Sequence, residues 1–290
     1  MLPPSVEDAI ATIADDHTSG ASRIARVGLE TMALLVVEEK GKPDPEALKE
    51  AARRISEAQP AMAIVHNVVA MFAQLVAEGM EPLAVRNQLQ EELEGAKERI
   101  ARSYLKIAPD DAVLVTTSFS DNVLATLQLA HEKGRIQRVL VLEARPLLEG
   151  RFLVIALKEA GIPASLAPDA LGPSLVAQAT GVLVGADSVL RDGAVVNKIG
   201  SYGLALAAKE HGKSFHVACE TLKFDARHDA SSWPGSRAMN PRELWENPPE
   251  RVDVVNRYFE VVPAALVTSI VTERGSYAPD LVKTMLAQAA

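Results

Sequence analysis

Residues 181–203, GVLVGADSVLRDGAVVNKIGSYG, contain the pattern from which the fold can be predicted. The apolar run at 182–184 is typical of a buried strand. The Asp-Gly pair at 192–193 stands between two short β-like segments, which indicates a hairpin. Sites in parallel sheets form where strands end, so we expect Asp187, which follows the apolar run, to lie in a site.

Outward from this stretch, the second part of the chain alternates between strand-like and helical segments. The candidate strands are 112–116, 138–142, 163–166, 181–184, 214–218 and 265–270. Such alternation predicts a parallel sheet covered by helices on both faces. Residues 1–108 show helical periodicity alone. The predicted fold class is therefore α/β, with an all-helical domain at 1–108 and a parallel-sheet domain at 109–290.

Three signals in the helical part make specific predictions. Asp44 before Pro45 is typical of an N-cap followed by proline in the first helical position. Ser5 with Asp8 resembles a capping pair. An amphipathic helix is expected to start near Pro82, and a coiled-coil interface is the weaker interpretation of its repeat.

Composition excludes several classes of protein. The net charge is −8, which argues against a general nucleic-acid binder, although a local basic site is compatible with it. A single cysteine, Cys219, excludes an intrachain disulfide framework and is typical of the reducing cytoplasm. The N-terminal residues lack the pattern of a signal peptide, and no apolar run reaches membrane-spanning length. We therefore expect a cytoplasmic protein that binds neither membranes nor, directly, nucleic acids.

Motifs for the common cofactors are missing from the sequence. It contains no GxGxxG, GxxxxGK[ST], CxxC or HExxH pattern, and its six histidines show no metal-ligand spacing. We therefore expect neither a resident cofactor nor a metal site.

Small polar residues follow the first candidate strand. Thr117, Ser118 and Ser120 precede a predicted helix, where hydroxyl and backbone groups can donate to a phosphate. The alternative is ordinary N-capping of that helix by Ser120 or Asp121. The sequence leaves both interpretations open.

Two arginines follow the second candidate strand, within EARPLLEGR at 143–151. Arg145 and Arg151 are suited to bidentate contacts with phosphate or carboxylate groups. An internal ion-pair network with Glu143 and Glu149 is the alternative.

The stretch quoted first supplies three further candidates. Asp187 could accept or donate a proton, while Asn197 and Lys198 precede the next helix. The alternatives are that Asp187 caps the tight connection that follows, and that Lys198 is simply its charge partner. All three candidate segments follow strands, so we expect them to meet in one cleft at the carboxyl edge of the sheet.

At this point four segments resemble the superfamily of the alpha, beta and delta subunits of translation initiation factor 2B. They are residues 185–225, the arginine motif 143–151, SGASRIARVGLETMALL at 19–35 and YFEVVPAALVTSIVTERG at 258–275. The superfamily also contains the methylthioribose-1-phosphate and ribose-1,5-bisphosphate isomerases. The resemblance implies a Rossmann-like second domain, usually the dimer interface, and a phosphorylated small molecule as ligand.

The resemblance also implies a catalytic pair. The isomerases use a cysteine and an aspartate; the aspartate falls on Asp187, and Ser118 stands where the cysteine is expected. A serine hydroxyl is a far poorer proton donor than a thiol near neutral pH. Ser19 and Gln59 stand where the family usually has phosphate-anchoring arginines. Cys219 could substitute chemically, but a buried structural thiol is the favoured interpretation.

Three functions follow as hypotheses. The first is a regulatory homologue that binds a sugar phosphate or nucleotide, which the departures at Ser118, Ser19 and Gln59 favour. The second is an aldose–ketose isomerase, an intramolecular oxidoreductase, which the retained Asp187, Asn197 and Lys198 favour. The third is an assembly subunit that uses helix 82–104 and the polar loop 223–250. A homodimer is expected through the second domain, with apolar helices at 146–160 and 198–208.

Overall fold

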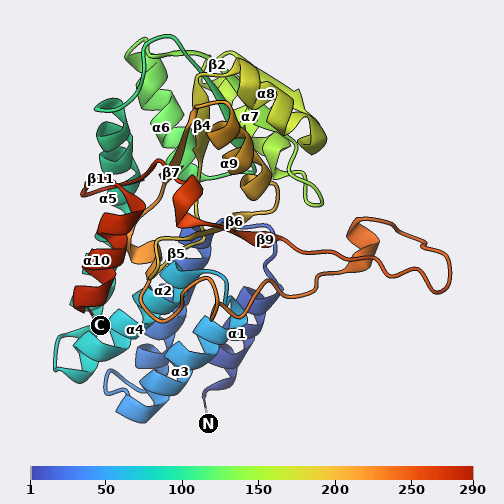
Figure 1. Ribbon diagram of the computed structural model, residues 1–290. Helices are drawn as coiled ribbons and strands as arrows, with labels where there is room; N and C mark the ends of the chain where they lie inside the picture. Colours follow the sequence, from blue (N-terminus) through green and yellow to red (C-terminus); the bar gives the residue numbers. More distant parts are fainter. Residues whose placement is uncertain (1, 290) are drawn as a thin grey trace. The chain divides into compact units, whose positions relative to one another are not determined.

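The computed structural model describes residues 2–289 (Figure 1). The chain divides between Ala96 and Lys97 into two compact units. The divide falls inside one long helix, α5 (Pro82–Leu105), which begins at the proline predicted from the sequence. The placing of a domain boundary at residue 108 stays a prediction.

Helices alone make up the first unit. Besides the start of α5 they are α1 (Pro4–Asp15), α2 (Ala21–Glu38), α3 (Pro45–Ala58) and α4 (Ala63–Ala77). Large side chains with no exposed surface form its core, among them Met32, Leu35, Ile55, Val65 and Phe72. The helical character predicted for the first part of the chain is confirmed.

One predicted helix cap is confirmed and one is wrong. The Asp44 side chain accepts a hydrogen bond from the Glu46 backbone N–H at 3.2 Å, as an N-cap should. Ser5 is not a cap, because α1 already begins at Pro4, whose ring presets the helical backbone angle. The Ser5 hydroxyl instead donates to the Glu38 carboxylate at 2.7 Å.

The second unit is built on a seven-stranded sheet in the order β11-β10-β7-β4-β1-β2-β3. Its strands are β1 (Ala112–Thr117), β2 (Ile136–Leu142), β3 (Ala164–Ala167), β4 (Gly181–Val184), β7 (Ser214–Ala218), β10 (Ser269–Thr272) and β11 (Gly275–Tyr277). Neighbouring strands are parallel except for the last pair, β10 and β11. The six parallel strands follow the doubly wound order 3-2-1-4-5-6 of Rossmann-type sheets, as the α/β prediction requires.

One predicted strand is displaced. The segment 265–270 was expected to be extended, but Ala264–Leu266 forms a 3₁₀ turn, η4, and β10 starts at Ser269. Pro263 explains the shift, because its fixed backbone angle suits the start of a turn and it donates no hydrogen bond to a ladder.

A second, four-stranded sheet has the order β8-β5-β6-β9. Its strands are β5 (Ser188–Leu190), β6 (Val195–Lys198), β8 (Phe224–Asp225) and β9 (Phe259–Val262). The predicted hairpin is confirmed, since β5 and β6 pair antiparallel around Gly193, which has a positive φ of 81°. Lys198 ends β6 directly opposite Phe259, so this small sheet positions one of the candidate residues.

Helices pack against the seven-stranded sheet. They are α6 (Asp121–Glu132), α7 (Glu149–Glu159), α8 (Gly172–Gln178) and α9 (Ser201–Glu210), with α10 (Pro279–Ala289) at the end. Helix α8 packs on α9, and the buried side chains of Val115, Val182, Leu204 and Phe215 belong to one apolar core. No helix in the part of the chain that the structure describes is long and apolar enough to cross a membrane.

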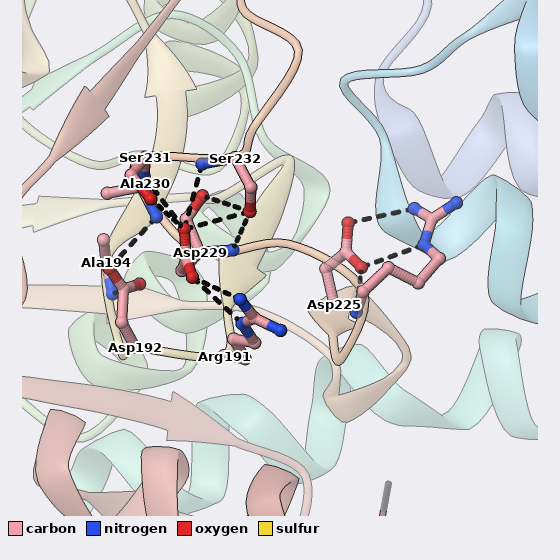
Figure 2. A network of polar contacts seen from close by, with 9 residues as sticks. Arg191, Asp192, Ala194, Asp225, Asp229, Ala230, Ser231 and Ser232 are labelled. Carbon is pink, nitrogen blue, oxygen red and sulfur yellow. Dashed lines mark hydrogen bonds and ion pairs between the residues drawn. The ribbon is translucent and has the colours of Figure 1, made fainter.

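A long loop, residues 226–258, leaves the small sheet after β8 and returns in β9 (orange in Figure 1). Figure 2 shows how its first residues are held: Asp229 pairs with Arg191, and the Ala230 backbone N–H donates to Asp192 at 3.0 Å. The hairpin turn between β5 and β6 and the start of the long loop are thus tied together. The loop expected from composition, 223–250, overlaps most of this segment, but the observed loop both begins and ends later in the chain.

Candidate functional site

The candidate segments follow three neighbouring parallel strands. Residues 117–122 begin with the last residue of β1, residues 143–151 follow β2, and residues 185–187 follow β4. The sheet places β4, β1 and β2 side by side, and the strand order reverses between β1 and β4. In doubly wound sheets this switch point is where ligands bind.

After β1 the chain turns sharply into α6. Ser118 is partly buried and has a positive φ of 65°, which is uncommon for a residue with a side chain. The Ser120 hydroxyl accepts from the Val123 backbone N–H at 3.4 Å and caps α6. A Cβ added at Gly185 would lie 2.8 Å from the Ser120 hydroxyl, so the end of β4 runs directly beside it. The capping interpretation of Ser120 is therefore confirmed, and phosphate binding by Thr117, Ser118 and Ser120 stays a prediction.

The arginines after β2 lie near the surface. The two carboxylate oxygens of Asp169 each accept a hydrogen bond from a backbone N–H group. One bond comes from Ala144 at 2.8 Å and the other from Arg145 at 2.7 Å. These bonds fix the backbone of Arg145, whose side chain is exposed. Arg151 is exposed as well and pairs loosely with Glu143 at 3.5 Å. The ion-pair interpretation holds in part for Arg151.

Lys198 and Glu149 form a close buried pair. The Lys198 ammonium lies 2.6 Å from the Glu149 carboxylate, and both side chains are largely excluded from solvent. The rings of Tyr258 and Phe259 lie beside the same ammonium, with centroids at 4.9 and 5.5 Å. Lys198 is thus not simply the charge partner of Asp187, because Glu149 is its direct partner.

Asn197 orders the start of the following helix. Its side-chain amide donates to the Ser201 hydroxyl at 2.9 Å, and that hydroxyl donates to the Lys198 carbonyl at 2.7 Å. Asn197 is buried, so these contacts hold the end of β6 and the first turn of α9 in a fixed relation. Its predicted contact with a ligand stays a prediction.

Asp187 lies among charged side chains. Its backbone N–H donates to the Val196 carbonyl at 2.8 Å, which fixes it beside β6. Burial raises the pKa of the Asp187 carboxyl to about 6; Lys223 and Lys198 oppose this increase, and Glu149 adds to it. A carboxyl with a pKa near 6 can take up and release a proton close to neutral pH.

A second buried cation lies in the same neighbourhood. Lys223 ends the 3₁₀ turn η2 (Thr221–Lys223) after β7, and its ammonium lies 3.3 Å from the Glu220 carboxylate. Asn122 of α6 donates to the same carboxylate at 2.8 Å. Burial disfavours the charged form of Lys223, but Glu220 and Asp187 together raise the pKa of Lys223 above its ordinary value. Lys223 therefore remains a cation next to Asp187.

Sequence reasoning did not assign roles to Lys223 or to Glu149 as the partner of Lys198. Both residues follow strands of the seven-stranded sheet, β7 and β2, so the rule that found Asp187 also covers them. The pairing of Glu149 with Lys198 could not be found in this way, because Lys198 lies in β6 of the second sheet. Among residues 2–286, whose side chains are described, no cluster of three or more potential metal ligands occurs.

Two further positions singled out in the sequence have local roles. Cys219 is fully buried, and burial raises the pKa of its thiol far above the ordinary value, which agrees with a structural thiol. In the helical unit, the Gln59 side-chain amide donates to the carbonyls of Ile13 at 2.7 Å and Asp16 at 3.0 Å. The Ser19 backbone N–H donates to the Asp16 carboxylate at 2.9 Å.

Comparison with known proteins identifies the family. The sequence profile of the initiation factor 2 subunit family, IF-2B, matches residues 17–279. The chain belongs to the initiation factor 2 subunit family. It is 31% identical to a putative translation initiation factor eIF-2B subunit 2-like protein from Pyrococcus furiosus, covering 96% of this chain and 98% of that one.

Some relatives in this family are named as translation initiation factors, and others are named as sugar-phosphate isomerases. A ribose 1,5-bisphosphate isomerase from Haloterrigena turkmenica is 29% identical, over 98% of this chain and 94% of that protein. A crystal structure of the translation initiation factor eIF-2B from Pyrococcus horikoshii superposes with a TM-score of 0.83 at 28% identity, covering 96% of this chain and 98% of that one. The resemblance found in the sequence and the fold class predicted from it are both confirmed.

Proposed function

We propose that this IF-2B family chain binds a phosphorylated sugar or a nucleotide at the carboxyl edge of its seven-stranded sheet, in a regulatory or weakly catalytic role. One observation carries the proposal. Asp187 lies at the switch point of the sheet, within the electrostatic reach of two buried lysines, Lys198 and Lys223. Such a mixed cluster of cations and a titratable acid suits an anionic ligand that also carries hydroxyl groups.

The proposed contacts follow from the segments around this cluster. Arg145 and Arg151 provide exposed guanidinium groups for a phosphate, and the turn from Thr117 to Ser120 adds neutral donors. Asp187 faces the reacting or recognised part of the sugar. Ser118, in place of the family cysteine, keeps its proton near neutral pH, so we expect weak catalysis.

The test is direct binding to the purified chain. Ribose 1,5-bisphosphate, methylthioribose 1-phosphate and AMP are titrated by calorimetry, and thermal shift records stabilisation of the native state. Arg145→Ala and Arg151→Ala should each weaken binding roughly 10-fold or more, because a charge-assisted contact is lost. Arg138→Ala, an exposed arginine within β2, is the matched control and should bind like wild type. If no phosphorylated probe binds, the proposal is wrong.

Isomerase activity is the second candidate, and the pKa of about 6 at Asp187 favours it. Opening an aldose 1-phosphate to its ketose needs a group that passes a proton between carbon and oxygen near neutral pH. The assay uses ribose 1,5-bisphosphate and methylthioribose 1-phosphate with wild type and Asp187→Asn. Turnover at ordinary enzymatic rates that disappears in Asp187→Asn would establish catalysis and reject the non-catalytic role.

Assembly and location complete the proposal. A homodimer through the second domain is supported by large apolar side chains that α7 and α9 expose, namely Phe152, Ile155, Tyr202 and Leu206. A cytoplasmic location is supported by the buried free thiol of Cys219. The acidic net charge of −8 supports the expectation that the chain does not bind nucleic acid directly.

A further inference from the structure

Tyr258 lies at the end of the long loop, where the chain enters β9. Its side chain is buried, and its backbone carbonyl accepts a hydrogen bond from the Ile199 backbone N–H at 2.9 Å. The next residue, Phe259, pairs directly with Lys198 across the small sheet. The backbone of Tyr258 is therefore held beside the end of β6.

The ring of Tyr258 covers the Lys198 ammonium. The distance from Nζ to the centroid of this ring is 4.9 Å, and the distance to the centroid of the Phe259 ring is 5.5 Å. The two rings are nearly perpendicular, at 82°. A cation so close to aromatic rings is attracted to them. Together with Glu149, which lies 2.6 Å from the ammonium, the rings take the place of solvent around Lys198.

The hydroxyl of the same ring is tied to the long loop. It donates to Oε1 of Glu243 at 2.7 Å, and Oε2 of that carboxylate accepts from the Asn256 amide at 2.7 Å. The Asn256 amide also donates to the Asn240 carbonyl at 2.8 Å. Burial and the Glu243 carboxylate both raise the pKa of Tyr258, so its hydroxyl keeps its proton and stays a donor. One side chain thus joins the loop to the Lys198 ammonium.

The loop segment that carries Glu243 is open to solvent. Glu243 ends a short 3₁₀ turn, η3 (Pro241–Glu243), in the orange segment of Figure 1. The large apolar side chains that follow it are between 37% and 67% exposed, namely Leu244, Trp245, Val252 and Val255. Segments with few buried apolar contacts open locally at a low cost in free energy. We therefore expect this segment to move more easily than the sheet to which Tyr258 is attached.

We propose that Tyr258 is a positioning residue for Lys198, and that its tie to Glu243 lets the long loop control access to the Lys198 ammonium. While the tie is closed, the ring keeps the ammonium on Glu149. When the loop segment moves away, the ring is released and the ammonium becomes accessible to an anion. The inference rests on the proposed function for the identity of that anion, whereas the accessibility of Lys198 can be measured without any ligand.

The experiment measures how fast Lys198 of the purified chain is acetylated by acetic anhydride, with peptide mass spectrometry as the readout. Only an accessible amine reacts, so the labelling rate follows the fraction of chains that are open. Tyr258→Phe keeps the ring and removes the hydroxyl, and Glu243→Ala removes the acceptor; both should label roughly 3- to 10-fold faster than wild type. Tyr258→Leu also removes the ring and should label faster still.

Two controls separate this role from a general effect on the fold. Glu246→Ala removes an exposed carboxylate from the same loop and should label at the wild-type rate. Lys223 is buried as well, and its labelling should stay slow in every variant. If Lys198 and Lys223 accelerate together, the variants loosen the whole domain and the inference is wrong. It is also wrong if neither Tyr258→Phe nor Glu243→Ala changes the labelling of Lys198.

A binding measurement distinguishes this inference from the proposed function. In stopped-flow experiments, ribose 1,5-bisphosphate should associate several-fold faster with Tyr258→Phe than with wild type, because a larger fraction of chains is open. Equal association rates would overturn the control of ligand access by the loop and leave the proposed function standing. If no phosphorylated probe binds either protein, the proposed function is wrong, and the labelling rates alone decide whether Tyr258 positions Lys198.

Discussion

The surroundings of Asp187 disfavour the ionised form of its carboxyl group. Burial outweighs the attraction of Lys198 and Lys223, so the pKa of its carboxyl in the folded chain is about 6, above the value near 3.9 of an unfolded chain. Between these two values the folded state binds more protons than the unfolded state. Protonation of Asp187 therefore adds to the free energy of unfolding at low pH, and this contribution is lost as the pH rises through 6.

The first prediction concerns Asp187→Asn. At pH 7.5 this variant should be more stable than wild type by roughly 1–3 kcal/mol, because an unfavourable, partly buried charge is removed. At pH 4.5 the advantage should fall well below half of that, since wild-type Asp187 is then largely neutral. Urea unfolding of both proteins at the two pH values measures the difference. An advantage that is equal at both pH values would contradict the raised pKa.

The second prediction concerns Ser118. Ser118→Cys should increase isomerase activity on ribose 1,5-bisphosphate at least 10-fold, because a thiol near neutral pH exchanges a proton far more easily than a hydroxyl. The two side chains are close in size, so the strained turn at φ 65° should be kept. Ser174→Cys, at an exposed residue of α8, is the control and should leave the activity unchanged. No gain in activity would mean that Ser118 does not limit catalysis.

How far the sequence predicted the site can be judged residue by residue. The strand-end rule and the family resemblance selected Asp187, Asn197 and Lys198. The structure places Asp187 just before β5 and the other two at the end of β6, the strand that pairs with β5. Neither predicted that Lys198 pairs with Glu149, because that contact joins two segments far apart in the sequence. A charge pair of this kind depends on the three-dimensional register of β6 and α7.

At the scale of elements, local signals predicted local structure well. The Asp-Gly pair correctly predicted the β5–β6 hairpin, and Asp44 correctly predicted the start of α3. The small sheet as a whole was not predicted, since β8 has two residues and β9 follows a long loop without periodicity. Sheets assembled from such short, distant strands leave almost no pattern of their own in a sequence.

The third prediction concerns the junction of β2 and α7. Gly150→Ala should destabilise the chain by about 2 kcal/mol or more, because the new methyl group would collide with the Leu142 carbonyl oxygen, a backbone atom that cannot move aside. Gly203→Ala in α9 is the control: no atom lies within 4 Å of the added Cβ, so it should be neutral or stabilising. Chemical unfolding measures both. Equal effects would argue against close packing at Gly150.

The fourth prediction concerns the start of the long loop. Asp229 accepts from Arg191, Ser231 and Ser232, so Asp229→Ala should loosen this segment (Figure 2). We expect limited proteolysis to cut within 226–258 several-fold faster than in wild type. Asp253→Ala removes an exposed carboxylate from the same loop and should leave the rate unchanged. An unchanged rate in Asp229→Ala would show that the network does not restrain the loop.

At the scale of the whole molecule, a single chain exposes large apolar side chains on α7 to solvent. Phe152 and Ile155 on α7 are 62% and 54% exposed, unusually high values for side chains of this size. Surfaces of this kind are commonly covered by another copy of the chain.

The fifth prediction follows from that surface. Wild type should sediment as a dimer at micromolar concentration, and Ile155→Asp should shift it to the monomer, because a charge would be buried without a partner. Val37→Asp places the same charge on α2 at a residue that is 72% exposed, and it should remain dimeric. A wild-type monomer under these conditions would refute the proposed homodimer.

The pairing of β7 with β10 has a consequence for how the chain is made. His216 lies opposite Ser269, so the whole long loop must be synthesised before this part of the sheet can close. Until β10 emerges from the ribosome, the backbone of β7 is an unpaired sheet edge that other nascent chains can join. Chains that terminate before Ser269 keep that edge permanently, and we expect them to aggregate rather than to fold into a shorter version of the domain.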